Sequence, residues 1–522
     1  MGEGEFDAVV VGAGHNGLTC AAYLARAGRR VLVLEGMETI GGMSGSEELA
    51  APGFLSDVHA SGYLVAKLGT APDELGLAGH GLRLITPDPN WAQVFPDGRK
   101  LLIGRDPQAT ARSIATFSTK DAETWLRIYG AYQAARSEIL GSLFSPPRPL
   151  AETLAAKGGA DGYRAQLQSG RSWAEETFES PEVRLFFTSA GLHAGLAPDD
   201  ALGGQFAWLF ASAIQDVGCS LVAGGMRHVT AALAEVVHAH GGEVRTGARV
   251  AAIEAAGGRA TGVRLADGAR ITVDGPIAVN ADPRTLVVDL LGAAAGPGLA
   301  ARIAGYDWGP SFFAIYLALD APVPWKAGPE VAGVSYVHAS ESSIDVLAGN
   351  FVEIRAGRAP ARPMLGIINE ASVDLSRAPA GKSLVKLVVH FVPWDLAGPD
   401  GRRDPAHWDA AKEGYADALL AWVDAAFLPG LRSRIVGRAV HSPLDLQRAT
   451  PSSVHGTHQH GAFLPWQVGA FRPLPELGQY RAPVAGVYLC GAGSHPGSGI
   501  SMGPGRNAAA AICADLGLAF PS

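Results

Sequence analysis

Short apolar runs alternate with helical spacing at the start of the chain. Residues 6–11 are rich in valine and stop at Gly12, and apolar residues then recur at helical intervals through 16–27. A second apolar run, 31–34, ends at Glu35. A strand, a helix and a strand within about thirty residues predict a βαβ unit, with parallel strands and a right-handed crossover.

The pattern changes in the next part of the chain. Apolar runs at 82–85 and 100–103 predict two strands around a turn at Pro96-Asp97-Gly98. Amphipathic spacing then predicts helical stretches over 106–141 and 181–214. This part is therefore expected to be a mixed insertion into the parallel unit.

Segment 224–282 returns to the style of the first segment. We expect a helix over 226–240, a strand over 243–245 and a hairpin over 248–273. Segment 487–516 again shows a strand, a glycine loop and a helix. Three separate pieces of chain are therefore expected to build one domain.

Between these pieces, segment 286–455 contains two long apolar runs, 312–317 and 384–391, and a helical pattern over 405–428. Such runs suit a sheet that forms the wall of a second domain. A chain of 522 residues, 48% of them hydrophobic, is also long enough to bury more than one core.

We predict an α/β protein of two domains. The nucleotide-binding domain is expected over 1–75, 216–285 and 456–522, and the substrate domain over 76–215 and 286–455.

The glycine loop after the first strand carries the clearest motif. Gly12-Ala13-Gly14-His15-Asn16-Gly17 is a G-x-G-x-x-G pattern that opens a helix. Gly12 permits the tight turn, Gly14 lets the backbone approach a pyrophosphate, and Gly17 lets helix and strand pack closely. Glu35 would accept hydrogen bonds from ribose hydroxyls. The pattern predicts a dinucleotide site, and a glycine turn without a ligand is the alternative.

Composition narrows the class of protein. The formal net charge is −8, and no basic cluster suggests a nucleic-acid partner. The four cysteines form no C-x-x-C pair, which favours a reduced protein over a zinc site or a disulfide framework. The first ten residues carry acidic rather than basic side chains, which argues against a signal peptide, and no apolar run reaches the length of a membrane span. We expect a cytoplasmic protein; peripheral membrane contact and the oligomeric state stay open.

Further motifs resemble one group of flavoproteins. Glu35 leads into Gly41-Gly42-Met43-Ser44, which resembles the E-x(5)-G-G-x-S extension of glutathione-reductase-like flavoproteins, and residues 486–503 resemble their closing flavin motif. Smaller matches lie at 95–98, 224–226, 280–283 and 460–461. Together they resemble the phytoene-desaturase-like FAD-dependent oxidoreductases, including the type named pyridine nucleotide-disulfide oxidoreductase domain-containing protein 2.

The resemblance implies FAD as cofactor and a glutathione-reductase-like Rossmann domain that is discontinuous, with a mixed α+β substrate domain. Val250 would contact the adenine side through its backbone, although a plain strand residue fits it almost as well. The residues that the motifs place at FAD are Gly12, Gly14, Asn16, Gly17, Glu35, Gly41, Gly42, Met43, Ser44, Val250, Gly491, Gly499, Ile500 and Met502. A second fingerprint, for NAD(P), is the alternative for Gly491-Ala492-Gly493, but no second strand ending in an acid follows it.

The same resemblance implies dehydrogenation of a hydrophobic or aromatic small molecule by hydride transfer to flavin N5. Oxygen, a quinone or another acceptor would reoxidise the flavin. The alternatives are redox-neutral isomerisation or saturation of a double bond, amine oxidation, and a flavin-binding interaction protein without turnover.

Histidines are the candidates for chemistry beside the flavin. His455-Gly456-Thr457-His458-Gln459-His460 allows three interpretations: acid–base work by His458 or His460, whose rings ordinarily titrate near neutral pH, a metal site, or a structural cavity wall. We name His458 and His460 as catalytic candidates and no residue as a metal ligand. His59 and His495 could contact the flavin ring or satisfy local backbone groups. Eight aromatic residues are expected in the core or along an apolar tunnel: Trp91, Trp208, Phe312, Phe313, Tyr316, Phe391, Trp394 and Trp466.

Overall fold

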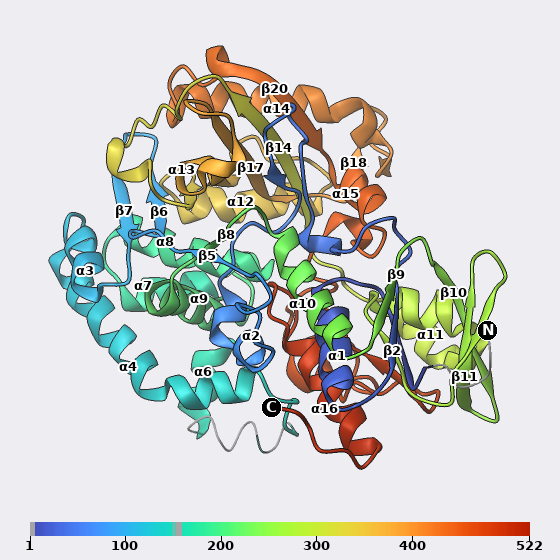
Figure 1. Ribbon diagram of the computed structural model, residues 1–522. Coiled ribbons are helices and arrows are strands. Elements are labelled where there is room, and N and C mark those ends of the chain that lie inside the picture. Colours follow the sequence, from blue (N-terminus) through green and yellow to red (C-terminus); the bar gives the residue numbers. More distant parts are fainter. Residues whose placement is uncertain (1–5, 150–151, 153–158) are drawn as a thin grey trace.

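The computed structural model describes residues 6–149, 152 and 159–522 (Figure 1). Its two large sheets are a parallel sheet of five strands and a mixed sheet of seven. Helices cover both, which confirms the predicted α/β class. The prediction that the chain has no signal peptide used the first ten residues, and residues 1–5 of these lie outside the described residues.

The parallel sheet has the strand order β21-β13-β1-β2-β9. Its strands are β1 (Ala8–Val11), β2 (Val31–Leu34), β9 (Glu243–Arg245), β13 (Ile277–Val279) and β21 (Val487–Leu489). Both faces are covered: Val10 packs among the helices, whereas Val9 packs in the core on the opposite side. The predicted βαβ unit is confirmed, because β1 and β2 pair in parallel and a helix connects them.

Helices cover one face of this sheet and a small antiparallel sheet lies on the other. The helices are α1 (His15–Arg26), α10 (Arg227–Ala239) and α16 (Gly503–Asp515). Figure 1 shows α1 and α16 side by side, although they come from opposite ends of the chain. The predicted hairpin is confirmed as β10 (Val250–Ala256) and β11 (Arg259–Leu265), extended by β12 (Arg270–Thr272). Next to it lie η4 (Thr285–Leu290) and α11 (Pro297–Ala304).

The seven-stranded sheet has the order β20-β14-β17-β16-β15-β6-β7. Its strands are β6 (Trp91–Val94), β7 (Lys100–Ile103), β14 (Ser311–Leu319), β15 (Tyr336–Ala339), β16 (Met364–Ile368), β17 (Ser383–Val392) and β20 (Ile435–His441). Alternate residues of β17 face opposite ways: Leu387 and Val389 pack with α14 (His407–Ala426), whereas Val388 and His390 line a cavity. The sheet is therefore one wall of the site.

A layer of helices lies beside the cavity-facing side of this sheet. They are α3 (Pro107–Ala115), α4 (Thr119–Leu143), α6 (Gly159–Leu167), α7 (Gly170–Thr177), α8 (Pro181–Gly191), α9 (Gly203–Val217) and α12 (Ile344–Arg355). Both predicted helical stretches are interrupted. In the first stretch, the break separates α3 from α4. Ser118 caps the start of α4, because its hydroxyl accepts a hydrogen bond from the Asp121 N–H. In the other, the short helix η3 (Leu192–Ala194) ends at Gly195, which adopts a φ of 75°.

One predicted strand pairing is wrong. The turn at 96–98 joins β7 to β6, not to the run at 82–85. That run contributes only β5 (Leu84–Ile85), which pairs with β8 (Leu221–Val222). Burial explains the difference, because every residue of β6 is buried, whereas Leu84 is exposed.

The remaining short helices and strands are α2 (Ala71–Glu74), α13 (Glu370–Val373), α15 (Pro443–Ala449), β3 (Ser46–Glu47), β4 (Ser56–Asp57), β18 (Leu396–Ala397) and β19 (Arg403–Asp404).

The two sheets draw on the segments that the sequence assigned to two domains. Strands at 8–34, 243–245, 277–279 and 487–489 form the parallel sheet, and strands at 91–103, 311–392 and 435–441 form the mixed sheet. The exact domain boundaries stay a prediction.

Candidate functional site

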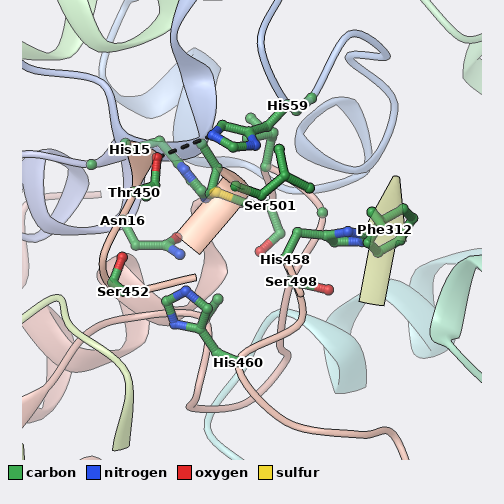
Figure 2. A pocket seen from close by; sticks show the side chains of 18 of the residues that line it. His15, Asn16, His59, Phe312, Thr450, Ser452, His458, His460, Ser498 and Ser501 are labelled. Atoms are coloured by element: carbon green, nitrogen blue, oxygen red, sulfur yellow. Dashed lines mark hydrogen bonds between the residues drawn. The ribbon is translucent and has the colours of Figure 1, made fainter. Parts of the chain in front are cut away.

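A cavity of about 1090 Å³ runs from the glycine loop of the parallel sheet to the inner face of the seven-stranded sheet. Its walls come from the N-terminal unit, the helical layer, segments 249–251 and 280–290, the mixed sheet, the loop 446–463 and the closing segment 492–501. Figure 2 shows side chains of His15, Asn16, His460 and Ser501 around the same space. Residues far apart in sequence therefore share one cavity.

The glycine loop packs directly on a neighbouring strand end. Gly12 has a φ of 95°, which favours glycine, and a Cβ there would lie 2.9 Å from the Asn280 carbonyl oxygen. A Cβ on Gly14 would lie 2.9 Å from the Asn280 side chain, and one on Gly17 would collide with the Gly12 carbonyl. Glycine at each position is thus required by the protein's own packing, and Gly12 and Gly14 also line the cavity.

Asn280, at the end of β13, supports this loop. With its amide in the orientation that satisfies its neighbours, its oxygen accepts from the N–H groups of Gly14 at 3.3 Å and Gly17 at 3.2 Å. The side chain also lines the cavity. The sequence drew attention to the 280–283 segment but did not name Asn280 as a site residue.

Glu35 stands at the carboxyl end of β2 and its carboxylate is held in place. One carboxylate oxygen accepts from the Ala13 N–H at 2.8 Å and the other from the Met37 N–H at 2.9 Å. The side chain lines the cavity beside the glycine loop. A fixed carboxylate here is suited to accept hydrogen bonds from hydroxyl groups of a ligand.

The extension after Glu35 folds against the glycine loop. The Gly41 N–H donates to the Ala13 carbonyl, and Gly42 and Met43 line the cavity. Asn16 also lines it, and its buried Oδ1 accepts no hydrogen bond from the described residues. Ser44 lies behind this surface, with its Oγ buried and likewise unpartnered.

The closing segment supplies the facing wall. Gly499 and Ile500 line the cavity with φ angles of 108° and 50°. Met502 has a φ of 59° and lies in the core at the start of α16. A positive φ in Ile500 and Met502 costs on the order of 1–3 kcal/mol each, so the surrounding packing must enforce this conformation.

Not every residue that the motifs indicated reaches the cavity. Val250 does, at the start of β10. Five residues lie behind its surface: Gly17, Gly41, Ser44, Gly491 and Met502. A Cβ on Gly491 would lie 2.9 Å from the Ala281 carbonyl oxygen, so this glycine serves the contact between strand ends.

The other end of the cavity is aromatic and aliphatic. Trp91 stacks on Tyr336 with ring centroids 4.3 Å apart, and Phe210 and Phe312 line the same region. Three carboxylates line the cavity, and they come from 35–47 and 285–290 rather than from this aromatic region: Glu35, Glu47 and Asp289.

The comparisons with known proteins agree with this geometry. A family model described as flavin containing amine oxidoreductase matches residues 17–395. The chain belongs to the flavin containing amine oxidoreductase family.

Curated relatives match over nearly the full length. Pyridine nucleotide-disulfide oxidoreductase domain-containing protein 2 of Rattus norvegicus is 30% identical, covering 98% of this chain and 94% of the relative. A limonene dehydrogenase component of Castellaniella defragrans is 28% identical, covering 98% and 95%. Hydroxyneurosporene desaturase of Cereibacter sphaeroides is 29% identical, covering 97% of each. The phytoene-desaturase-like resemblance is confirmed, and the chain is an FAD-dependent oxidoreductase.

Solved structures share the fold. An oxidoreductase from Methanosarcina mazei aligns with a TM-score of 0.62 at 17% identity, covering 98% of this chain and 99% of the other. A putrescine oxidase triple mutant aligns with a TM-score of 0.60 at 14% identity, with the same coverage. These structural similarities establish the fold of the flavoprotein and say nothing of its substrate.

The residues present fit FAD. The glycine loop gives a close approach to backbone, Glu35 is a fixed acceptor, and Asn16 Oδ1 is a buried acceptor without a partner among the described residues. The alternative of a second nucleotide fingerprint at 491–493 is not supported by the fold, because β21 belongs to the same parallel sheet as β1.

His458 and His460 both line the cavity of the flavoprotein, with His460 below Asn16 and Ser452 in Figure 2. Burial lowers the pKa of His458 to about 4. Burial, then the charges of Arg472, His15 and His458, lower the pKa of His460 to about 3. The expectation that these rings titrate near neutral pH is wrong, because both are desolvated and stay uncharged.

The loop that carries His460 is fixed from behind. Buried Arg472 donates to the carbonyls of Gln459, Gly461 and Ala492, and Tyr306 donates to the His460 carbonyl at 3.1 Å. His460 Nδ1 is buried and has no partner among the described residues. The ring therefore presents hydrogen-bonding capacity that the protein itself does not use.

The other histidines named from the sequence have different surroundings. His59 lines the cavity and its Nε2 lies 3.0 Å from Thr450 Oγ1, as the dashed line in Figure 2 shows. His455 stacks on Trp394 at 5.0 Å. His495 lies just outside the cavity lining, and its buried Nε2 has no partner among the described residues.

Of the aromatic residues named from the sequence, Trp91, Phe312 and Trp394 line the cavity. Phe313 packs in the core beneath α14, whereas Trp466 is 63% exposed. Sequence reasoning missed His193, His338 and His390, which meet at the aromatic end. The strand alternation at 384–391 was a usable signal for His390, because its neighbour Val389 faces the core on the other side of the sheet.

Within residues 6–149, 152 and 159–522, no three His, Cys, Asp or Glu side chains are grouped so that they could hold a metal ion. In the same part of the chain, every helix is too short or too polar to cross a membrane.

Proposed function

We propose that this protein dehydrogenates a hydrophobic or aromatic small molecule. The observation that carries the proposal is the aromatic end of the cavity, where the described side chains are mostly aromatic rings, aliphatic groups and uncharged histidines and none is a carboxylate. A protonated amine needs an anion or a comparable partner when it leaves water, and an apolar substrate does not. The relatives named as a dehydrogenase and a desaturase support the same reaction class.

The lining of the cavity supports a set of residues that would hold FAD. Gly12, Gly14 and the start of α1 would hold the pyrophosphate, because they line the cavity and the N-terminus of a helix favours a negatively charged group. Glu35 would accept from the ribose, and Val250 would lie at the adenine side. The remaining motif residues would form the flavin side or support it: Asn16, Gly17, Gly41, Gly42, Met43, Ser44, Gly491, Gly499, Ile500 and Met502. When bound, FAD would accept a hydride at N5 of its ring.

His460 would take part in the proton step. Removing two hydrogens from a substrate releases a proton besides the hydride, and an uncharged imidazole has the lone pair to receive it, although burial, which lowers its pKa, opposes the charged form. His460 Nδ1 has no partner among the described residues and its ring lines the cavity, so it is the first candidate; His458 lines the same space. Burial would also keep water away from both rings.

The test is anaerobic flavin reduction. The FAD-loaded protein is mixed without oxygen with a panel of terpenoid and aromatic hydrocarbons and alcohols, and the visible flavin band is followed. At least one compound should bleach the flavin, whereas NADH and NADPH alone should not, because the described fold has one dinucleotide unit.

His460→Ala at equal FAD content should slow that bleaching about 10²–10⁴-fold, the usual value of a proton-transfer residue. His441→Phe is the control, because His441 lies outside the cavity lining. Conversion of a double bond without net bleaching would instead indicate isomerisation or saturation, and bleaching by amines alone would indicate amine oxidation. Binding without either reaction would indicate a flavin-binding protein without turnover.

A further inference from the structure

His193 lies at the aromatic end of the cavity, in the break between α8 and α9. It belongs to η3 (Leu192–Ala194) and lines the cavity. Its ring stacks on Phe210 with centroids 4.4 Å apart and meets the edge of Trp91 at 5.4 Å. A polar ring is thus embedded among aromatic rings, with the ring of His390, which also lines the cavity, 5.0 Å away.

A chain of hydrogen bonds leads from His193 into the core. Its Nε2 lies 2.8 Å from Nε2 of His338, a fully buried residue of β15. His338 Nδ1 lies 3.4 Å from Ser189 Oγ. Ser189 in turn donates to the Phe186 carbonyl at 2.8 Å. The four groups come from α8, η3 and β15.

The positions of the protons follow from this chain. Ser189 has one hydroxyl hydrogen, and the 2.8 Å bond to the Phe186 carbonyl is the best placed to take it. Ser189 Oγ then accepts from His338 Nδ1–H. An uncharged His338 carries no second hydrogen, so its Nε2 accepts from His193 Nε2–H. An uncharged His193 is left with a bare lone pair on Nδ1.

Nothing within the described part of the protein uses that lone pair. Among the described residues, the Nε2 contact with His338 is the one hydrogen bond of the His193 ring. Burial, followed by the charges of His390, His338 and His458, lowers the pKa of His193 well below its usual value, which keeps the ring uncharged. An oriented acceptor therefore remains at a cavity wall.

We propose that His193 accepts a hydrogen bond from a hydroxyl group of the substrate, so that the protein prefers an apolar alcohol to the hydrocarbon or ether of the same skeleton. A carbonyl or ether oxygen has no hydrogen to donate, and a carboxylate would bring a second lone pair against the first. The apolar rings around His193 would contact the carbon skeleton. The inference rests on the proposed function only in taking this end of the cavity as the substrate site.

The test measures binding, not turnover. FAD-loaded protein is titrated anaerobically with matched sets of geraniol, perillyl alcohol and 2-naphthalenemethanol, each beside its methyl ether and its deoxy hydrocarbon. Binding is followed by calorimetry and by the shift of the flavin band. In at least one set the alcohol should bind about ten-fold more tightly than its ether and hydrocarbon, since one partner of a buried hydrogen bond is lost in each.

Variants assign the preference to His193. His193→Phe should abolish it, His193→Asn should retain part of it through the amide oxygen, and His338→Phe should weaken it by freeing the His193 tautomer. His441→Phe, outside the cavity lining, should leave it intact. If His193→Phe fails to hold FAD, His338→Phe decides the matter, because it leaves the wall residue in place.

Equal binding of alcohol, ether and hydrocarbon in the wild-type protein overturns the proposal, as does failure of every alcohol to bind. A preference that persists in both His193→Phe and His338→Phe also overturns it. An alcohol preference without flavin reduction would support His193 as a binding residue while contradicting the proposed dehydrogenation.

Discussion

At the scale of single residues, the glycines of this site are required for two different reasons. Gly12 needs its positive φ, whereas Gly14 needs the absence of a side chain, because Asn280 and the cavity lie on either side of it. The motif therefore encodes packing within the protein as well as room for a ligand. For His460 the residue type was misleading. A histidine ordinarily takes up a proton near neutral pH, but burial lowers the pKa of this one and keeps it uncharged.

Gly14→Val tests whether Gly14 must lack a side chain. The added branches would meet the Asn280 side chain and intrude where the pyrophosphate would approach, so the variant should purify with less than about a tenth of the wild-type FAD. FAD is released by heat and quantified against standards. Gly130→Val is the control, because Gly130 is exposed on α4 with open space around its Cα. Full FAD content in Gly14→Val would mean that the loop does not hold the pyrophosphate.

At the scale of elements, β17 links the mixed sheet to the cavity wall near the parallel sheet. Its Lys386 is fully buried and donates to the carbonyls of Asp57 at 2.8 Å and His59 at 2.9 Å. Glu370 accepts from Ser61, and Arg377 pairs with Asp57 at 2.7 Å. These buried charges fix segment 57–61, from which His59 and its neighbours line the cavity.

Lys386→Met should lower the free energy of unfolding by about 3–5 kcal/mol, because the carbonyls of Asp57 and His59 lose their donor and the buried carboxylates of Asp57 and Glu370 lose a nearby positive charge. It should also reduce FAD retention, since segment 57–61 would lose its anchor. Lys120→Met removes an exposed ion pair with Glu179 and should cost less than about 1 kcal/mol. Denaturant unfolding of both variants compares the two. Similar small losses would show that segment 57–61 is held by packing alone.

At the scale of the whole molecule, burial keeps many histidines uncharged. The described histidines whose pKa falls to about 4 or below are His15, His59, His390, His458, His460 and His495. Each would take up a proton near pH 6.5 in the unfolded chain but not in the folded one. Their contribution to stability is complete above about pH 6.5 and is lost as the pH falls toward about 4.

The free energy of unfolding should therefore fall between about pH 7 and pH 5, by up to about 1.4 kcal/mol per pH unit for each such histidine. Glu370 has the opposite effect on the free energy of unfolding. Burial raises its pKa to about 7, so the stability that it contributes is lost as the pH rises from about 4.5 to 7. Denaturant titrations at a series of pH values with saturating FAD measure how steeply the free energy of unfolding changes with pH. His495→Phe should reduce this pH dependence by up to about 1.4 kcal/mol per pH unit, because its buried ring no longer takes part. A flat profile would mean that these rings are protonated in the folded protein.

The sequence alone determined the parts of this protein whose physics is local. The βαβ unit, the glycine loop and Glu35 lie within about thirty residues, so spacing and residue type were enough to predict strand, turn, helix and acid together. The closing motif was likewise readable from its own glycines.

Only the tertiary structure decided what depends on distant contacts. The pairing of β7 with β6 depends on which run is buried, and the meeting of His193 with His338 joins residues 145 positions apart. The charge state of His460 depends on Arg472, His15 and the dry surroundings that the whole fold creates. Burial and long-range contact are properties of the assembled molecule, because each neighbour comes from a different part of the chain, and no local pattern contains them.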